Sequence, residues 1–404
     1  MTTTPQYGQP FIGPKEGEVA GNWLGVPDIL PYEDHMAAQR IPINRGIGIS
    51  DAREAKLEPW ERLGVDGAFY ALEGASNTLE VAVIQVNPGK GSIPEKHLFE
   101  KVYYVVSGYG STEVWQGDGE PVSRFEWREG SFFTIPRNRT HRLISASSSG
   151  ARLIVAGNAA RIINAFGDED FIFDNDYRFT AGDAAEGKKF EPSLDFLTSP
   201  NHRAMWRTLF VPDVGKTPLA KDGQRAPGSH RVEFEFPGSR MFVFMNEYPT
   251  GRYSRAHYHP SGAVLLCVAG EGYTLNWPRE LGKTPWLDGN GDQVQRLDYR
   301  PGGFVAAAPG GGDWFHQHFG IGKEPLRLLA VSSWAHEELV DGGRPDRENI
   351  SLNRPITEGG HAIAYHEEDP FVRMTFERGL AKNGLESTMP RAAYDGPLDE
   401  EKRK

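Results

Sequence analysis

Two pairs of histidines in the second half of the chain are the residues best suited to chemistry. His257 and His259 stand one residue apart, and so do His316 and His318. Residues two apart in an extended strand point to the same face, so each pair would present its two imidazoles together. Neutral imidazole binds Fe²⁺, Mn²⁺, Ni²⁺ and Zn²⁺, and two or three such ligands leave coordination positions open for a substrate. The pairs therefore predict a site for one divalent transition metal.

The alternative is a pocket without metal, in which hydrogen bonds satisfy each histidine. Apolar side chains normally fill a protein interior, so four converging imidazoles need an explanation, and coordination is the simplest one. Spacing alone does not decide whether His316 or His318 is the third ligand.

Four residues near the histidines are candidate substrate contacts. Arg255 and Arg327 would hold a substrate carboxylate with two hydrogen bonds if they pointed inward. Trp314 and Phe315 flank the second pair and would line an apolar pocket. The simpler interpretation is that the two arginines are solvated strand residues and that the two aromatic side chains belong to the ordinary packing of the barrel.

An internal repeat organises the chain. A shift of 162 positions aligns Gly89 with Gly251, His97 with His259, Gly108 with Gly270 and Trp115 with Trp277, without a gap. Each copy continues with a Gly-to-Pro segment, residues 130–136 and 303–309, followed by His141 or by His316 and His318. A longer loop, roughly residues 279–293, separates the two motifs in the second copy. Such agreement indicates a duplicated domain.

Short strands are expected within each copy, because apolar runs there are bounded by glycine and proline. The expected strands are residues 102–107, 110–115, 131–135 and 153–156, then 264–269, 273–277, 304–308 and 326–331. Evenly spaced strands with glycine corners predict an all-β fold, a sandwich or a small barrel. A short helix is expected at residues 369–382, with Pro370 in its first turn. Its apolar face would carry Phe371, Met374, Phe376 and Leu380.

The motifs resemble those of the cupin superfamily, in its two-domain (bicupin) form. The first motif there is a glycine, His-x-His, a glutamate and a Gly-x-Gly-like turn, and the second is a glycine, a proline and a histidine. The resemblance implies two tandem double-stranded β-helix (jelly-roll) barrels with an N-terminal arm and a short C-terminal helix. The expected boundaries are an arm at 1–65, barrel 1 at 66–173, a connector at 174–229, barrel 2 at 230–335 and a C-terminal extension at 336–404.

The chain departs from the cupin pattern at the metal-ligand glutamate. Ala263 stands at that place in the second repeat and Lys101 in the first, next to Glu100. Glu95 replaces the first histidine of the first repeat. A mixed second site of Glu95, His97, Glu100 and His141 is conceivable, but an inward Lys101 would oppose a cation. We therefore expect one metal ion per chain, in barrel 2, from a full imidazole set.

A three-histidine set without glutamate resembles the gentisate 1,2-dioxygenase group. This resemblance implies His257, His259 and His316 as ligands of Fe²⁺, with His318 in a catalytic role beside them. The implied activity is an Fe(II) dioxygenase that uses O₂ on a small aromatic hydroxy-acid. That group usually keeps its metal in the first barrel, unlike the arrangement expected here. Two alternatives stay open: a non-oxidative metal-dependent cupin, such as an isomerase or decarboxylase, and a non-catalytic bicupin that binds a small molecule.

The charge and cysteine content of the chain limit the kinds of molecule that it is expected to bind. The 404 residues carry a net charge of −11, which disfavours nucleic acid and anionic membrane surfaces as partners. The single Cys267 excludes an intrachain disulfide and suggests a reducing compartment. No signal peptide or membrane-spanning run is visible. We expect a cytoplasmic protein that binds a small-molecule substrate and forms homo-oligomers, as bicupins often do through their arms.

Overall fold

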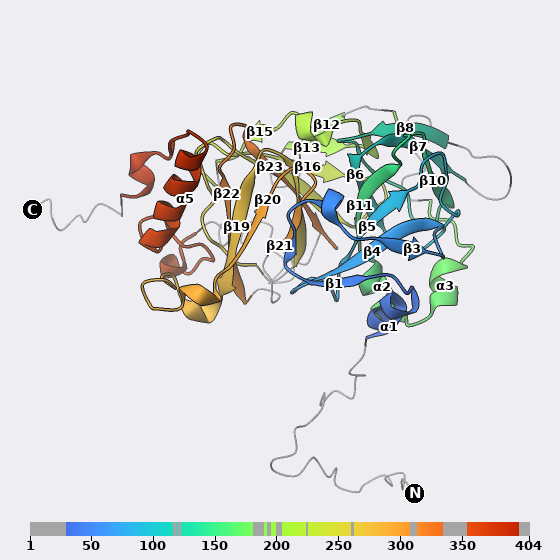
Figure 1. Cartoon of the computed structure of the whole chain (residues 1–404), viewed down its shortest axis with the longest axis horizontal. Helices are drawn as coiled ribbons and strands as arrows, with labels where there is room; N and C mark the ends of the chain where they lie inside the picture. The colour runs from blue at the N-terminus through green and yellow to red at the C-terminus, as the bar shows by residue number, and fades with distance from the viewer. Residues whose placement is uncertain are drawn as a thin grey trace, which may run out of the picture.

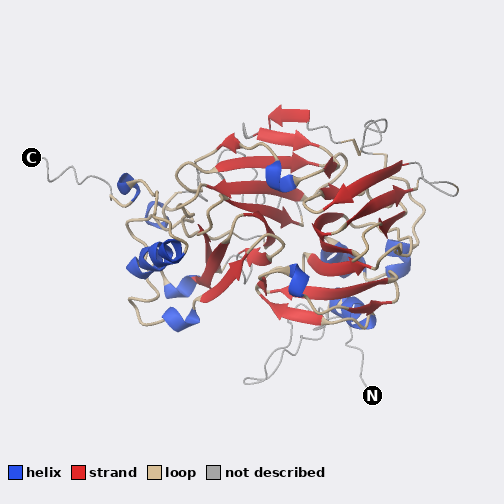
Figure 2. Cartoon of the chain, turned by 45° about the horizontal axis from the view of Figure 1, so that its top comes forward, coloured by secondary structure: helices blue, strands red, loops and turns tan. Residues whose placement is uncertain are grey.

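Two β-rich units lie side by side in the computed structural model (Figure 1). The structure describes residues 30–115, 119, 123–180, 190–191, 195–198, 204–223, 225–259, 262–307, 313–333 and 354–395. Helices lie around the outside of the two units, and the strands form their interior (Figure 2). No helix within these ranges is both long and apolar enough to cross a bilayer.

The first barrel consists of a large sheet and a small one. The large sheet has the order β1-β4-β5-β11-β6-β9-β14, with β3 beside β4, and the small sheet has the order β10-β7-β8. The large-sheet strands are β1 (Ile43–Gly46), β3 (Glu58–Trp60), β4 (Val65–Leu72), β5 (Glu80–Val86), β6 (Lys101–Ser107), β9 (Phe132–Thr134), β11 (Ala151–Gly157) and β14 (Phe210–Val211). The small-sheet strands are β7 (Tyr109–Val114), β8 (Ser123–Arg128) and β10 (His141–Ser145).

The second barrel repeats this plan. Its large sheet has the order β12-β13-β16-β17-β23-β18-β21-β2, with β15 beside β16, and its small sheet has the order β20-β19-β22. The large-sheet strands are β2 (Gly48–Ile49), β12 (Asp195–Thr198), β13 (Ala204–Arg207), β15 (Ala220–Lys221), β16 (His230–Glu235), β17 (Phe242–Tyr248), β18 (Ala263–Ala269), β21 (Phe304–Ala307) and β23 (Leu326–Ser332). The small-sheet strands are β19 (Gly272–Pro278), β20 (Gln295–Tyr299) and β22 (Trp314–Gly320).

Short helices connect and cover the sheets. The α-helices are α1 (Pro31–Ala38), α2 (Ala159–Phe166), α3 (Glu169–Phe173) and α5 (Pro370–Lys382). The 3₁₀ helices are η1 (Ala52–Glu54), η3 (Val214–Lys216), η4 (Arg279–Leu281), η5 (Gly291–Gln293), η7 (Ile356–Glu358) and η8 (Arg391–Ala393). The sequence patterns gave no expectation of α1, α2 or α3, which are each eight residues or shorter.

The two large sheets pack against each other, and this contact explains their nearly continuous apolar strands. In β6, Val102, Tyr104 and Val106 belong to a core cluster that also contains Val264 and Leu266 of β18. The intervening residues of each strand face the interior of their own barrel, as Tyr103 does in barrel 1. A strand buried on both faces shows no polar alternation, so hydrophobicity alone could not tell which residues face a cavity.

Glycine is required at one turn of each repeat. Gly108 and Gly270 have φ angles of 83° and 73°, and both precede the first strand of a small sheet. A Cβ atom would lie 2.4 Å from the carbonyl oxygen of Gly150 in the first case and 2.5 Å from that of Pro325 in the second. Any other residue would be strained in conformation and in space, which confirms the turns expected at these positions.

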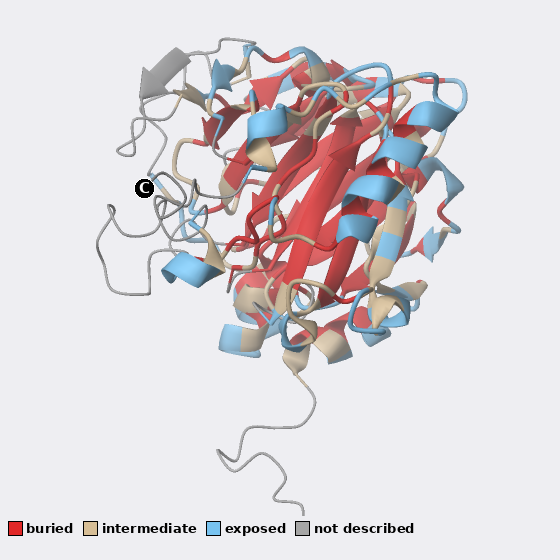
Figure 3. Cartoon of the chain, turned by 90° about the vertical axis from the view of Figure 1, so that its left-hand side faces the viewer, coloured by how far each residue is buried: buried red, intermediate tan, exposed pale blue. Residues whose placement is uncertain are grey.

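The C-terminal helix covers the small sheet of barrel 2. Pro370 stands at its first turn, and the Asp369 side chain accepts a hydrogen bond from the Phe371 amide. Its buried face consists of Val372, Phe376 and Leu380, whereas Phe371 and Met374 are 36% and 37% exposed. The exposed side of α5 is visible in Figure 3, with buried strands behind it. The all-β fold with two tandem barrels and a short C-terminal helix is thus confirmed. Of the expected apolar face, Phe376 and Leu380 are buried, and the Phe371 ring stacks on Trp286 at 4.8 Å between centroids. Only the inclusion of Met374 is wrong, because the helix turns Val372 inward in its place.

Candidate metal centre

The four histidines of the second repeat lie inside barrel 2. His257 and His259 belong to the segment that leads into β18, and His316 and His318 lie on β22. The backbones of His257 and His316 pair directly, with N–O distances of 3.1 and 2.9 Å. This pairing brings two residues 59 positions apart into register, so that their imidazoles lie together inside the barrel.

Three of these imidazoles form a compact group. One ring nitrogen each of His257, His259 and His316 lie within 4.8 Å of one another. The His316 ring centroid is 4.2 Å from that of His257 and 4.8 Å from that of His259. His318 is not in the group, although its ring lies 5.4 Å from that of His316. The geometry therefore favours His316 over His318 as the partner of the first pair.

The donor set fits a divalent transition metal. The Nδ1 atom of His257 lies 3.1 Å from the carbonyl oxygen of Arg255, so a proton on Nδ1 leaves the Nε2 lone pair free for coordination. The Nδ1 atom of His316 is buried and has no hydrogen-bond partner among the described residues. A buried polar nitrogen without a partner destabilises the fold unless a hydrogen-bond donor or a metal ion binds it.

Burial keeps the histidines neutral, as metal binding requires. The pKa of His257 is lowered well below its ordinary value by burial and then by Arg225 and His259. The pKa of His316 is likewise lowered, by burial and by the neighbouring imidazoles. Burial and Arg225 lower the pKa of His318 to about 3. All three are therefore unprotonated at neutral pH.

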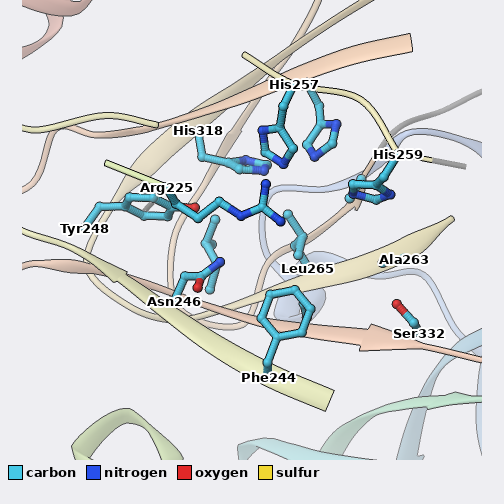
Figure 4. Close-up of a pocket in the computed structure, with 14 residues that line it drawn as sticks. Arg225, Phe244, Asn246, Tyr248, His257, His259, Ala263, Leu265, His318 and Ser332 are labelled. Atoms are coloured by element: carbon cyan, nitrogen blue, oxygen red, sulfur yellow. The ribbon is translucent and has the colours of Figure 1, made fainter. Parts of the chain in front are cut away.

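A small cavity lies between these rings and the opposite wall of the barrel (Figure 4). Its volume is about 20 Å³, enough for one ordered water molecule. Besides the four histidines, polar side chains of Arg225, Asn246, Tyr248 and Ser332 line it, together with apolar Phe244 and Leu265. No aspartate or glutamate is among the described residues of the lining. The cavity thus offers nitrogen ligands, one permanent cation and no carboxylate.

Arg225 is the site residue that sequence reasoning missed. It lies in the loop between β15 and β16, is 8% exposed, and directs its guanidinium toward His257 and His318 (Figure 4). The loop shows neither a strand pattern nor a repeat match, so no signal in the sequence marked it. Arg225 lowers the pKa of His257, His316 and His318, which shows how closely its charge faces all three imidazoles.

The structure does not support the substrate contacts expected at Arg327 and Phe315. Arg327 pairs with Glu247 at 2.7 Å and donates to the carbonyl oxygens of Gly215 and Thr217, outside the cavity. Phe315 packs against Trp277 in the core beneath the C-terminal extension. On β22 residues alternate, so the histidines and Phe315 point to opposite faces.

Trp314 and Arg255 also lie outside the cavity lining. Trp314 is half-buried at the beginning of β22. The backbone carbonyl of Arg255 positions His257, whereas its side chain is not part of the lining. The structure therefore shows a positioning role for the Arg255 main chain, and a substrate contact of its side chain stays a prediction.

The first barrel brings together only part of its expected second site. Donor atoms of Glu95, His97 and His141 lie within 4.8 Å of one another. Glu100 is not with them, because its carboxylate accepts hydrogen bonds from the Arg240 amide at 3.0 Å and from Asn158 at 3.2 Å. Glu100 therefore connects the two barrels, and its expected role as a ligand is not supported.

Comparison with known proteins agrees with the fold. Residues 82–157 match the family model described as "Cupin domain". No curated protein sequence is similar enough to this chain to count as a relative.

Solved structures with a similar fold include oxalate decarboxylases. A variant of the Bacillus subtilis enzyme has 12% identity and a TM-score of 0.43, covering 72% of this chain and 78% of its own. The Lactobacillus farciminis enzyme in a formate complex has 14% identity and a TM-score of 0.43, covering 71% and 86%.

Proposed function

We propose that barrel 2 is the active site of a metal-dependent enzyme that acts on a small carboxylate by a non-oxidative reaction, such as decarboxylation or isomerisation. His257, His259 and His316 would hold one divalent ion. The observation that supports the proposal best is the guanidinium of Arg225, buried in the same cavity as the imidazole group. Mn²⁺, Fe²⁺, Ni²⁺ and Zn²⁺ all suit the nitrogen ligands.

Charge favours an anionic substrate. Arg225 is permanently cationic, and its guanidinium lines the same cavity as the four histidines. A bound divalent ion would add two further positive charges in a poorly solvated space, where electrostatic interactions are strong. A substrate carboxylate would compensate these charges, and the planar guanidinium can hold it with two hydrogen bonds.

The size of the cavity favours a small substrate. Its volume of about 20 Å³ is that of one water molecule, so any substrate requires movement of side chains, and an aromatic ring requires more than a short carboxylate does. A carboxylate with few further heavy atoms needs the least rearrangement. On size alone, a short carboxylic acid is therefore a better candidate substrate than an aromatic hydroxy-acid.

The residues around the cavity would orient the substrate and control its protons. A divalent ion at the imidazole group would polarise a bound oxygen as a Lewis acid. Arg225 would fix the carboxylate against the opposite wall. Burial raises the pKa of Tyr248 to about 12, so its hydroxyl stays protonated and can donate a hydrogen bond. His318, neutral and 3.5 Å from the Tyr299 hydroxyl, would contact the substrate rather than accept a proton.

An Fe(II) dioxygenase is the second candidate, favoured by the chemistry of the donor set. Ala263 stands where a carboxylate ligand would otherwise reach the ion, and all remaining donors are neutral nitrogens. Such a set leaves iron dipositive with several positions for substrate and O₂. This candidate requires O₂ consumption in step with substrate loss.

One experiment separates the proposals. Metal-free protein would be reconstituted under argon with Mn²⁺, Fe²⁺, Ni²⁺ or Zn²⁺ and supplied with short mono- and dicarboxylates and with aromatic hydroxy-acids. We expect substrate loss, with or without CO₂ release, at equal rates in argon and in air. O₂ uptake that matches substrate loss would select the dioxygenase. Metal binding without turnover of any substrate would leave a non-catalytic binding protein and contradict both.

A matched pair of variants tests the role of Arg225. Arg225→Met removes the buried charge and should abolish carboxylate turnover, whereas Lys221→Met removes an exposed charge on the neighbouring β15 and should have no effect. Equal activity in the two variants would show that the buried guanidinium does not bind substrate.

A further inference from the structure

Lys101 occupies, in barrel 1, the position that Ala263 occupies in barrel 2. Each is the first residue of its strand, β6 and β18, and the two are 162 positions apart, as Glu95 and His257 are. Lys101 is 3% exposed. Its Nζ atom lies 3.4 Å from Oε1 of Glu95 and 3.8 Å from Oε1 of Glu80. The side chain therefore ends inside the barrel, beside two carboxylates.

The two carboxylates beside the Lys101 ammonium each have a further hydrogen-bond partner. The other oxygen of Glu95 lies 3.4 Å from a guanidinium nitrogen of Arg62, and that of Glu80 accepts from the Tyr32 hydroxyl at 3.2 Å. Two carboxylates thus face two cations. In barrel 1 the charges of the interior cancel without an added ion.

The two histidines of barrel 1 are arranged as metal ligands are. The Nδ1 atom of His97 lies 2.8 Å from the Phe99 carbonyl oxygen and that of His141 lies 3.0 Å from the Arg139 carbonyl oxygen, so the lone pair of each ring is on Nε2. The Nε2 atom of His141 accepts a hydrogen bond from the Tyr103 hydroxyl at 2.8 Å, which a metal ion would have to displace. The Nε2 atom of His141 is 3.7 Å from Oε1 of Glu95. The Nε2 atom of His97 is buried and has no hydrogen-bond partner within the described residues.

We propose that the ammonium of Lys101 is the resident cation of barrel 1 and excludes a divalent metal from the Glu95, His97 and His141 group. The ammonium lies beside the same Glu95 oxygen that would coordinate the metal, so an ion there would meet a buried like charge. At the matching place in barrel 2, Ala263 leaves the space open and brings no charge. By this proposal, the residue at this one strand position decides whether barrel 1 binds metal.

The substitution Lys101→Met tests the proposal directly. It removes the charge and keeps most of the side-chain volume, and it would leave Glu80 and Glu95 as oxygen donors beside two imidazoles. The variant is made in a chain that also carries His257→Ala and His259→Ala, so that barrel 2 contributes no metal. After reconstitution with Mn²⁺ or Co²⁺ and dialysis, elemental analysis should rise from none to one ion per chain.

Two control variants test whether the additional metal ion binds at the Glu95, His97 and His141 group. Lys96→Met removes a lysine that pairs with the fully exposed Asp176 and should bring no metal. Adding His97→Ala to the Lys101→Met chain should abolish the gain. The visible absorption of bound Co²⁺ should appear in the Lys101→Met chain and be lost with His97→Ala. A metal ion that survives His97→Ala overturns the proposal, and so does a folded Lys101→Met chain that binds none.

A second measurement does not depend on a substitution at Lys101. The chain with only His257→Ala and His259→Ala keeps the native barrel 1 and should hold no Mn²⁺ or Co²⁺ after dialysis. One tightly held ion in that chain would show that the ammonium does not exclude metal. None of these results depends on whether barrel 2 is catalytic, so this inference and the proposed function fail separately.

Discussion

The two barrels place different chemistry at corresponding positions of one scaffold. Residues 80–105 of barrel 1 correspond to 242–267 of barrel 2 by the shift of 162. After the longer loop of the second copy the shift becomes 175, so residues 141–157 correspond to 316–332. Seven of the paired positions line both cavities with different residues, among them four pairs that differ in polarity or charge: Ile84 and Asn246, Glu95 and His257, Lys101 and Ala263, and Leu143 and His318. Each cavity has a volume of about 20 Å³. The barrels therefore differ in charge and donor type rather than in size.

This difference shows how a duplicated site can separate structural and chemical roles. Barrel 1 encloses an ion-paired interior, and burial alone would raise the pKa of Glu95, but Lys101, His97, His141 and Arg62 hold it well below its ordinary value. Barrel 2 encloses neutral imidazoles and an arginine. The charged groups of barrel 1 are paired with one another, whereas the imidazole group of barrel 2 is suited to bind a metal ion.

The largest expected effect concerns the barrel that holds the metal. His259→Ala removes one of three proposed ligands and should lose the metal and all activity, whereas Glu100→Ala should keep both, because Glu100 bonds to Arg240 and Asn158. Elemental analysis of dialysed protein measures the difference, with circular dichroism as the check on folding. Equal metal loss from the two variants would contradict the assignment of the metal to the histidines of barrel 2.

The next effect separates the two histidines of β22. His316→Ala should lose the metal outright, while His318→Ala should retain most of it and lose activity by about 10–100-fold, as residues that contact ligands typically do. Metal retention is measured by elemental analysis and activity by substrate loss. Loss in His318→Ala with retention in His316→Ala would reverse the assignment, and retention in both would make the imidazoles a substrate pocket.

A smaller effect is expected from the cation of barrel 2. Arg225→Lys keeps the charge but loses the planar pair of donors, so KM for a carboxylate should rise by about 10–100-fold, the worth of a charge-assisted hydrogen bond. Metal content should not change. A kcat loss at unchanged KM would instead place Arg225 in the chemical step.

The smallest effect concerns a carboxyl group outside barrel 2. Glu368 accepts hydrogen bonds from Tyr253 and Gln317, but burial raises its pKa from 4.5 to about 8. The folded state then binds a proton that the unfolded state releases above pH 4.5, so stability falls as pH rises from there to about 8. Glu368→Gln should raise Tm by several degrees at pH 8.5 and much less at pH 5.

The buried carboxyl group of Glu95 in barrel 1 should behave in the opposite way. Glu95→Gln removes a partner of Lys101 and Arg62 and should lower Tm at neutral pH. Thermal melts of both variants at the two pH values measure this contrast. A lower Tm for Glu368→Gln at pH 8.5 would mean that its carboxylate is stabilised by its neighbours.

The duplicated pattern of the sequence determined the fold and the pairing of the histidines. Alternation along a strand requires His316 and His318 to share one face, and the repeat places His97 and His259 at the same point of each barrel. Both statements depend only on local geometry and on comparison of the two copies, so they needed no coordinates.

Only the tertiary structure decided which other side chains enter the two cavities. Arg225 reaches the imidazoles from a loop without periodicity, and Arg327 turns away because Glu247 and two backbone carbonyls bind it. Both faces of β6 are buried, so the hydrophobicity of the strand could not predict which face carries the Lys101 side chain. Only the structure shows that this side chain points into barrel 1. These contacts join residues distant in sequence, and their energies depend on partners that only folding brings together.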